Sequence, residues 1–259
     1  EKNNLFYLFL SGLSLGASFS VKWAGGTFFI LALLLLFFKN KKVIREKIKS
    51  LFFLFFSFLI VYLFSFQIHF QLIPNKSENK IAYEQAAFVG DDFEKLNFFQ
   101  KLWYLNKAML ESQKTLRNTL HPYQSDPYFW PLMKKEIFYW VEGEKKIFLI
   151  GNPFIWYSAT FSFFILILSF IFVKLKKFFQ YSDFFGFFIF FAFFINYLPF
   201  FFIQRPLFLY HYLPAYSFLI AHLSFLLEKI KEKDKILFFF FLLLSFLFFF
   251  KNFALSYGL

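Results

Sequence analysis

Seven long apolar blocks constrain this chain more than any other feature of its sequence. They cover approximately residues 4–21, 24–38, 51–70, 154–173, 184–203, 206–227 and 236–250. A helix that crosses a bilayer needs roughly 20 apolar residues, and these blocks are apolar on every side, as lipid-embedded helices are. The first and last are short and would need snorkelling flanks such as Lys251. The sequence predicts an all-α, polytopic membrane protein with about seven transmembrane helices.

The charge and the cysteine content exclude several other classes of protein. The net charge is +12, which in a soluble protein would suggest a nucleic-acid partner. Here the basic residues lie at the ends of apolar blocks, where they orient a membrane protein, so we predict no nucleic-acid binding. The absence of cysteine excludes disulfides, thiolate catalysis and Cys-ligated zinc. We also expect no metal site, because His121 and Asp126 are too few to hold an ion.

The charged connections predict how the chain is oriented in the membrane. Three connections together hold thirteen basic residues, and they lie at residues 39–49, 174–177 and 228–235. The short connections at the opposite helix ends hold only Lys22 and Arg205. Because short cytoplasmic loops carry the excess of Lys and Arg, we predict that the three basic connections are cytoplasmic.

A long polar stretch at residues 71–153 separates three predicted helices within residues 1–70 from four within residues 154–259. With the basic connections inside, this stretch is an extracytoplasmic loop. Residues 101–120 within it predict an amphipathic helix, whose apolar face comprises Leu102, Leu105, Met109, Leu116 and Leu120. The helix either lies along the membrane, with Trp103 and Tyr104 in the headgroup zone, or packs on the rest of the loop.

Polar and aromatic residues gather in four stretches, each at the outer end of a predicted helix. These are SVKWAGG at 20–26, HPYQSDPYFWP at 121–131, GNPFIW at 151–156 and RPLFLYHYLP at 205–214. Pro122, Pro127 and Pro131 break helical structure in the second stretch, which is therefore predicted to be a rigid, irregular loop. Because all four stretches fall on one side of the membrane, they predict a single site at the outer interface.

The ionisable residues in these stretches have both structural and functional explanations. Arg205 and Lys22 either anchor helix ends in the headgroup zone or bind a phosphate through charge-assisted hydrogen bonds. The pattern places His211 inside an apolar helix, where it either bonds a neighbouring helix or belongs to the site. Asp126 is a candidate general base, whereas Asp183 falls on the cytoplasmic side.

The remaining candidates are less specific. Trp130, Trp140 and Trp156 fit the aromatic belt at the membrane surface, although flat rings near a polar site also stack on sugars or line a lipid groove. Asp91 and Asp92 lie in an ordinary polar stretch, where we expect them to be solvated. The spacing of the acidic residues does not reveal a catalytic carboxylate.

Taken together, the four stretches resemble motifs of the protein O-mannosyltransferase family, in the same order along the chain. GLSLGASFSVKWAGG resembles the G-x-x-x-G-x-x-x-x-x-K-W-x-G motif, and HPYQSDPYFWPLM resembles H-P-Y-x-S-x-x-x-x-W-P. GNPFIWYSA resembles G-N-P-x-x-W, and RPLFLYHYLPAYSF resembles R-x-x-F-x-Y-H-Y-L-P-A. The likeness runs over residues 12–218, and the four blocks from about residue 154 look like the family's C-terminal four-helix membrane domain.

The resemblance implies a GT-C type glycosyltransferase that moves mannose, with inversion, from a polyprenyl-phosphate donor to Ser or Thr of a protein at the outer membrane face. The lipid-linked sugar is a substrate, and no cofactor is expected. The implied residues for the donor phosphate are Arg205, Lys22, His211 and Tyr210. Those implied for the sugar or the acceptor are His121, Tyr123, Trp130, Asn152 and Trp156.

Other expectations follow from comparing this chain with the family pattern. The family's catalytic base is an acidic residue in the first outer loop, which would lie upstream of residue 1, so we read the chain as an incomplete C-terminal portion. The loop at residues 71–153 is too short for the trefoil repeats of eukaryotic relatives, which favours a bacterial cytoplasmic membrane. Membrane lipid, the acceptor protein and a homo- or hetero-dimer partner are the expected partners. A transferase for another sugar, acting on lipid A or a glycan, and a catalytically incomplete subunit are the alternatives.

Overall fold

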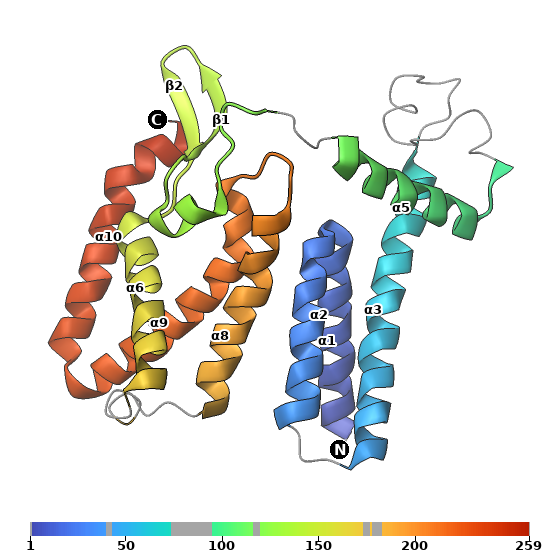
Figure 1. The fold of residues 1–259 in the computed structure, drawn as a ribbon, viewed down its shortest axis with the longest axis horizontal. Coiled ribbons are helices and arrows are strands. Elements are labelled where there is room, and N and C mark those ends of the chain that lie inside the picture. The colour runs from blue at the N-terminus through green and yellow to red at the C-terminus, as the bar shows by residue number, and fades with distance from the viewer. Residues whose placement is uncertain are drawn as a thin grey trace. The chain divides into compact units, whose positions relative to one another are not determined.

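The computed structural model describes residues 2–39, 43–73, 95–115, 120–172, 177 and 183–258. It consists of two compact units, Glu1–Leu116 and Arg117–Leu259. Figure 1 colours the chain from blue at the N-terminus to red at the C-terminus, so that the helices of the first unit are blue to green and those of the second are yellow to red. The predicted Asp91 and Asp92 lie outside the described residues.

The first unit is built of helices that follow the first three apolar blocks. They are α1 (Lys2–Val21), α2 (Gly26–Leu34), which continues as a π-helical turn (Leu35–Lys39), α3 (Ile44–Leu72) and α5 (Phe98–Thr115). Helices α1 and α3 pack along each other. Phe58 of α3 contacts Phe19 of α1 and Phe29 of α2, with ring centroids 5.4 and 4.8 Å apart. This unit is therefore held by close helix packing and aromatic contacts.

Helix α5 confirms the predicted amphipathic helix, with earlier bounds. Leu105 is 4% exposed, and the Tyr62 hydroxyl of α3 donates to Asn106 Oδ1 at 2.8 Å. Leu120 lies beyond the helix and is 88% exposed, so it does not belong to the apolar face, and Leu116 is outside the described residues. The apolar face of α5 therefore packs on α3, and not only on the rest of the loop as one alternative had it. Trp103 remains exposed.

Two glycines allow α1 and α3 to approach closely. A Cβ at Gly12 would collide with Ser57 Oγ and with the Leu54 carbonyl oxygen, and one at Gly16 would lie 2.5 Å from the Phe58 carbonyl oxygen. Small residues four apart are what membrane helices use for such backbone contact. The G-x-x-x-G spacing noticed in the sequence therefore has a packing role in this structure.

Replacing Gly12 by Leu is expected to destabilise the first unit by about 1–3 kcal/mol, because the overpacked side chain must push α3 away. The measurement is thermal unfolding of the purified protein in detergent. Ala17→Leu is the matched control, since Ala17 lies on the exposed side of α1. Equal melting temperatures for the two variants would contradict the close approach of α1 and α3.

The second unit is a four-helix bundle with a β-hairpin above it. Its elements are a 3-10 turn (Pro127–Leu132), β1 (Ile137–Glu142), β2 (Lys145–Leu149), α6 (Pro153–Ile171), α8 (Asp183–Tyr197), two more 3-10 turns (Leu198–Phe202 and Leu209–Tyr212), α9 (Leu213–Lys233) and α10 (Lys235–Tyr257). Helix α9 packs against α6, α8 and α10. Caps fix the helix starts: Asn152 Oδ1 accepts from the Ile155 N–H at 3.2 Å, and Asp234 Oδ1 accepts from the Leu237 N–H at 3.0 Å.

The β-hairpin is an addition to the predicted all-α fold. β1 and β2 pair antiparallel, from Ile137 with Leu149 to Glu142 with Lys145. Gly143 occupies the first central position of the two-residue turn with φ of +59°, which fits a type II′ hairpin. Our sequence reading missed the short run of Tyr, Trp, Phe and Val around this glycine, which is a recognisable hairpin signal.

Five helices are long and apolar enough to cross a membrane, and they lie at residues 44–72, 153–171, 184–202, 209–233 and 235–254. Two shorter apolar helices, Leu5–Val21 and Trp23–Phe38, match the first two blocks. Of the seven predicted transmembrane helices, five are therefore long enough to cross a membrane in the described residues, and the last of them is longer than expected. Phe and Leu side chains remain exposed along these helices, as on α10, which is the surface expected of an integral membrane protein facing lipid.

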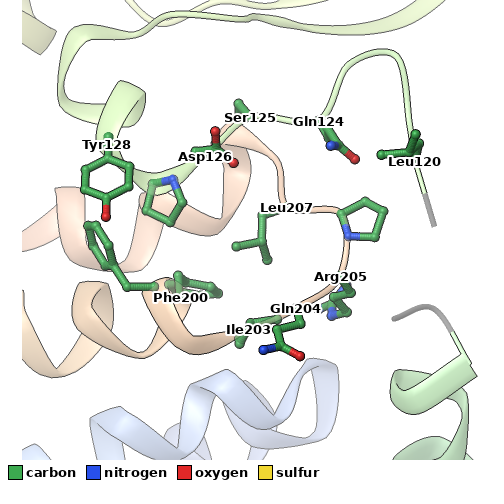
Figure 2. Close-up of a pocket in the computed structure, with 13 residues that line it drawn as sticks. Leu120, Gln124, Ser125, Asp126, Tyr128, Phe200, Ile203, Gln204, Arg205 and Leu207 are labelled. Carbon is green, nitrogen blue, oxygen red and sulfur yellow. The ribbon is translucent and has the colours of Figure 1, made fainter. Parts of the chain in front are cut away.

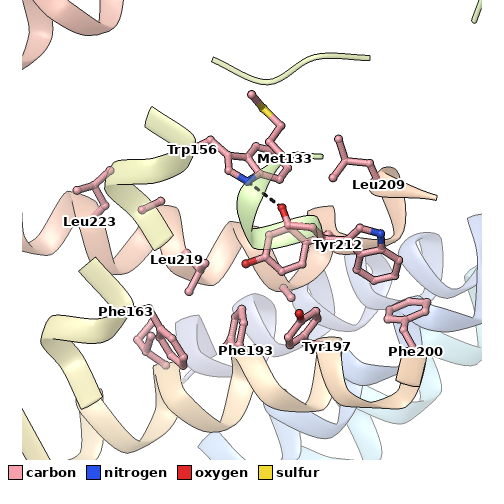
Figure 3. Close-up of a cluster of buried hydrophobic side chains, with 14 of the residues drawn as sticks. Met133, Trp156, Phe163, Phe193, Tyr197, Phe200, Leu209, Tyr212, Leu219 and Leu223 are labelled. Atoms are coloured by element: carbon pink, nitrogen blue, oxygen red, sulfur yellow. Dashed lines mark hydrogen bonds between the residues drawn. The ribbon is translucent and has the colours of Figure 1, made fainter. Parts of the chain in front are cut away.

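The core of the second unit is aromatic towards its hairpin end (Figure 3). Trp130, Tyr212 and Leu209 are almost fully buried there. Lower in the bundle, His222 of α9 lies 3.1 Å from the Ser162 hydroxyl of α6, measured at Nδ1, and both are buried. We assign this pair to packing, because polar contacts between membrane helices stabilise their association.

Candidate functional site

Two of the polar stretches found in the sequence meet at the hairpin end of the second unit. The Ser125 N–H donates to the Leu207 carbonyl at 2.8 Å, which joins the HPYQSDP loop to the segment that precedes α9. The Tyr197 hydroxyl at the end of α8 donates to the Pro127 carbonyl at 2.8 Å. These two bonds hold segments that are far apart in the sequence against each other.

A pocket of about 310 Å³ lies between these two segments (Figure 2). Its lining comprises Leu120, Gln124, Ser125, Asp126, Pro127, Tyr128, Phe200, Phe201, Ile203, Gln204, Arg205, Pro206 and Leu207. Polar side chains come from both sides, with Gln124 and Asp126 on one segment and Gln204 and Arg205 on the other. The pocket therefore combines a cation, a carboxylate and two amide groups with apolar surface, as ligand sites combine a few polar groups with an apolar lining.

Arg205 is partly exposed in this pocket. Within the described part of the chain, its guanidinium forms no ion pair, and Tyr210 lies near it. A guanidinium that has no carboxylate partner can offer its N–H groups to a phosphate. The structure thus brings together Arg205 and Tyr210, two of the residues predicted to bind the donor phosphate.

His211 is placed differently from the prediction. It lies in the 3-10 turn Leu209–Tyr212, which runs directly into α9 and forms the first turn of the apolar segment at residues 209–233. Its side chain is 2% exposed, and Nδ1 accepts from the Phe208 N–H at 3.1 Å. The ring stacks on Tyr210 with centroids 4.3 Å apart. His211 therefore caps the turn that contains Tyr210. It lies nearer the start of the helix than the sequence predicted, because Pro214 in the first turn of α9 starts that helix later than hydropathy suggests.

His121 and Tyr123 remain accessible at the edge of the pocket. His121 Nδ1 accepts from the Tyr123 N–H at 3.2 Å, and its ring contacts Phe208 edge-on at 5.0 Å. Tyr123 stacks on Phe138 of β1 with centroids 5.4 Å apart. Both side chains are exposed, so the contact with sugar or acceptor predicted for them stays a prediction that this geometry allows.

Trp130 and Trp156 are structural in this arrangement. They are 0% and 3% exposed. Trp130 Nε1 donates to Ser125 Oγ at 2.9 Å, and Trp156 Nε1 donates to the Trp130 carbonyl at 3.0 Å, the bond drawn in Figure 3. Because both rings are enclosed by protein, the sugar contact predicted for them has no support from this geometry. Their interactions fix the HPYQSDPYFWP loop to the bundle.

Asn152 also has a structural explanation. Its Oδ1 caps α6, and its Nδ2 donates to the Ser245 carbonyl of α10 at 2.7 Å. Lys22 is exposed between α1 and the following 3-10 turn, in the other unit. The predicted meeting of Lys22 with Arg205 therefore stays a prediction.

The sequence reading missed two pocket residues, Gln124 and Gln204. Each is adjacent to or within a stretch that had been singled out: Gln124 follows Tyr123, and Gln204 precedes Arg205. A Gln next to an Arg or Tyr at a helix end carries no specific signal by itself. Only the pairing of the two segments shows that these amides share a cavity with Arg205.

The Tyr197 hydroxyl supplies a test of how the pocket is held. Tyr197→Phe removes the bond to the Pro127 carbonyl and is expected to lower the stability of the second unit by about 1 kcal/mol. The change is measured as a shift of the unfolding midpoint in denaturant. Tyr257→Phe, on an exposed tyrosine of α10, is the control. A shift no larger than that of the control would show that the bond does not hold the loop.

Residues 98–259 match the family model of the C-terminal four-transmembrane region of protein O-mannosyltransferase. Protein O-mannosyltransferase 1 of Drosophila pseudoobscura pseudoobscura is 30% identical over 187 aligned residues, which cover 63% of this chain and 20% of that protein. Dolichyl-phosphate-mannose–protein mannosyltransferase 1 of Saccharomyces cerevisiae is 29% identical over 170 aligned residues, which cover 61% of this chain and 19% of that protein.

A solved structure supports the same relationship. The Saccharomyces cerevisiae Pmt1–Pmt2 complex bound to the sugar donor matches with a TM-score of 0.53 and 30% identity, over 63% of this chain and 25% of that chain. The likeness confirms the expected helical membrane fold of the GT-C type. The chain spans about a fifth of the length of the two curated relatives. Because the family model matches more than half of the chain, the chain belongs to the protein O-mannosyltransferase family.

Proposed function

We propose that the pocket around Arg205 binds the phosphate of a polyprenyl-phosphate mannose donor, as part of an enzyme that transfers mannose to Ser or Thr hydroxyls of proteins. The observation that carries the proposal is the convergence of two family-like stretches, HPYQSDP and QRPL, on one cavity. The donor is a substrate, so the reaction needs no separate cofactor. The transfer inverts the sugar's configuration.

The chemistry of the pocket suits a lipid-linked phosphate. When the mannosyl bond breaks, negative charge grows on the departing phosphate, and a positioned guanidinium stabilises that charge more in the transition state than in the bound donor. Tyr210, which the resemblance assigns to the donor phosphate, lies near Arg205 but outside the pocket lining. The apolar residues Ile203 and Leu207 of the lining give the first isoprene unit a surface to contact.

The helix ends support a site at the extracytoplasmic face. Helices α6 and α9 begin, and α8 ends, at the end of the bundle where the pocket lies (Figure 1). The basic stretch at residues 228–235 joins α9 to α10 at the other end. Since basic connections stay in the cytoplasm, the pocket faces the other side of the membrane. The relatives named above are eukaryotic, and the bacterial membrane expected from the sequence stays a prediction.

The proposal also concerns a second cation, the general base and a partner subunit. The resemblance also assigns Lys22 of the first unit to the donor phosphate, and this role stays a prediction. Asp126 is a carboxylate in the pocket lining, but the resemblance assigns the general base to another outer loop, so Asp126 is not proposed as that base. Pairing with a second membrane subunit is proposed because the structural neighbour is a complex of two such chains.

The proposal is tested by mannosyl transfer in membranes that contain the protein. Dolichyl-phosphate [³H]mannose and a peptide rich in Ser and Thr are supplied, and labelled peptide is counted. We expect transfer of mannose and not of aminoarabinose from its polyprenyl phosphate. Transfer of only a non-mannose sugar would favour the alternative GT-C transferase. Binding of the mannose donor without transfer to any acceptor would favour the incomplete subunit.

A further inference from the structure

The β-hairpin has one covered strand edge and one open strand edge. The C-terminal end of α10 packs against β2, and a Cβ at Gly258 would lie 3.0 Å from Ile147 and 3.9 Å from the Lys146 carbonyl oxygen. Among the described residues, no strand pairs with the other side of β1, since the sheet has two strands. Figure 1 shows β2 beside α10 and β1 on the side away from it.

The turn geometry identifies which backbone groups point away from the hairpin. In a hairpin closed by two residues, the flanking pair is hydrogen bonded, and the next pair directs its N–H and C=O groups outward. Here the flanking pair is Glu142 with Lys145, and the next is Val141 with Lys146. Among the described residues, Val141 therefore presents an N–H and a C=O without a backbone partner at the open edge of β1.

The open edge lies next to the pocket that we assign to the donor. Phe138 of β1 stacks on Tyr123, which precedes the pocket residue Gln124. Tyr139 of β1 and Arg205 of the pocket both lie near Tyr210. The side chains along this edge are accessible, with Tyr139, Trp140 and Val141 exposed by 57, 42 and 49%.

We propose that the open edge of β1, centred on Val141, binds the acceptor polypeptide in an extended conformation and guides its hydroxyl side chain towards the Arg205 pocket. This inference rests on the proposed function for the identity of the occupant. An exposed strand edge is a template for another strand, and recognition by strand addition draws affinity from main-chain hydrogen bonds. Such binding accepts many sequences that carry a Ser or a Thr.

A polypeptide fits this edge better than the lipid surface does. Unpaired backbone groups are costly in hydrocarbon, because nothing there can bond to them. The residues that flank Val141 towards the turn are Glu142, Gly143, Glu144 and Lys145, and the charged ones among them are exposed. Aromatic rings at an open edge can stack on peptide side chains while the charges remain in water.

The experiment measures binding of a fluorescent eight-residue Ser/Thr peptide to the full chain in nanodiscs, by anisotropy. Val141→Pro removes the outward N–H, and we expect it to weaken binding about tenfold. Lys146→Pro is the matched control, because it makes the same change in the facing residue on the covered strand. A peptide N-methylated at alternate residues is expected to lose affinity to the same extent, and this arm needs no folded variant.

Several outcomes would overturn the proposal. The first is that the unaltered chain does not bind the peptide detectably. The second is that the Val141→Pro variant binds the peptide as tightly as the unaltered chain does. The third is that the methylated peptide binds as tightly as the plain peptide. A photo-crosslinker at Val141 that labels lipid in place of peptide would assign the edge to the membrane surface. Failure of the proposed function looks different: peptide would bind at the β1 edge, but no mannose would be transferred. If mannose is transferred but the peptide does not bind at β1, only the proposed role of the β1 edge is wrong, and the proposed function stands.

Discussion

Replacing Arg205 by Ala is expected to lower kcat for mannosyl transfer by about 10²–10³-fold, the loss seen when one preorganised donor to a developing anion is removed. The reason is that Arg205 lines the pocket and, within the described residues, forms no ion pair, so its charge is available to the departing phosphate. Arg205→Lys should retain part of the activity, since an ammonium keeps the charge and loses the two-pronged geometry.

The assay uses saturating polyprenyl-phosphate mannose and follows labelled acceptor peptide, with membrane insertion checked by protease protection of the loops. Lys235→Ala is the control, because it removes a cation from the same unit at the start of α10. A kcat for Arg205→Ala close to that of the control would remove Arg205 from the site. Loss of insertion along with activity would mean that Arg205 anchors the helix end in the headgroup zone, which is the structural explanation left open by the sequence.

Replacing Trp130 by Ala is expected to have the largest effect on stability, about 3–5 kcal/mol. The ring is 0% exposed and contacts Tyr197, Phe200, His211 and Tyr212, and its Nε1 donates to Ser125 Oγ. Truncation leaves a cavity and an unpaired Ser125 hydroxyl, so the HPYQSDP loop should separate from the segment that carries Arg205.

This second prediction is checked by unfolding of the purified chain in detergent, together with affinity for the lipid-linked donor. Trp130→Phe should fall between Ala and the unaltered protein, since it keeps most of the packing and loses the bond to Ser125. Trp103→Ala is the control, because Trp103 is 69% exposed. If Trp130→Ala unfolds like the control but fails to bind donor, the indole contacts substrate directly, as the sequence suggested, and our structural assignment is wrong.

The local pattern of apolar and polar residues was sufficient to predict the main features of the fold. The length and uniform apolarity of the blocks predicted the spans, because a bilayer imposes the same requirement on every helix that crosses it. Periodicity predicted α5, and its boundary was misjudged at the C-terminal end, where Leu120 is outside the helix. The hairpin around Gly143 was missed, because a long polar loop was read only for helical and proline signals.

The candidate site, like the fold, could be predicted from the sequence only in part. The sequence by itself determined which four stretches are unusual and predicted that each lies at a helix end, since proline, charge and hydropathy act through near neighbours. Only the tertiary structure decided that Arg205, Gln204 and Gln124 share a pocket while Trp130 and Trp156 are buried behind it. The physical reason is that burial depends on contacts between distant segments, such as the Ser125 N–H bonded to the Leu207 carbonyl. The motifs therefore identify the candidate residues, and packing between distant segments decides which of them remain accessible to a substrate.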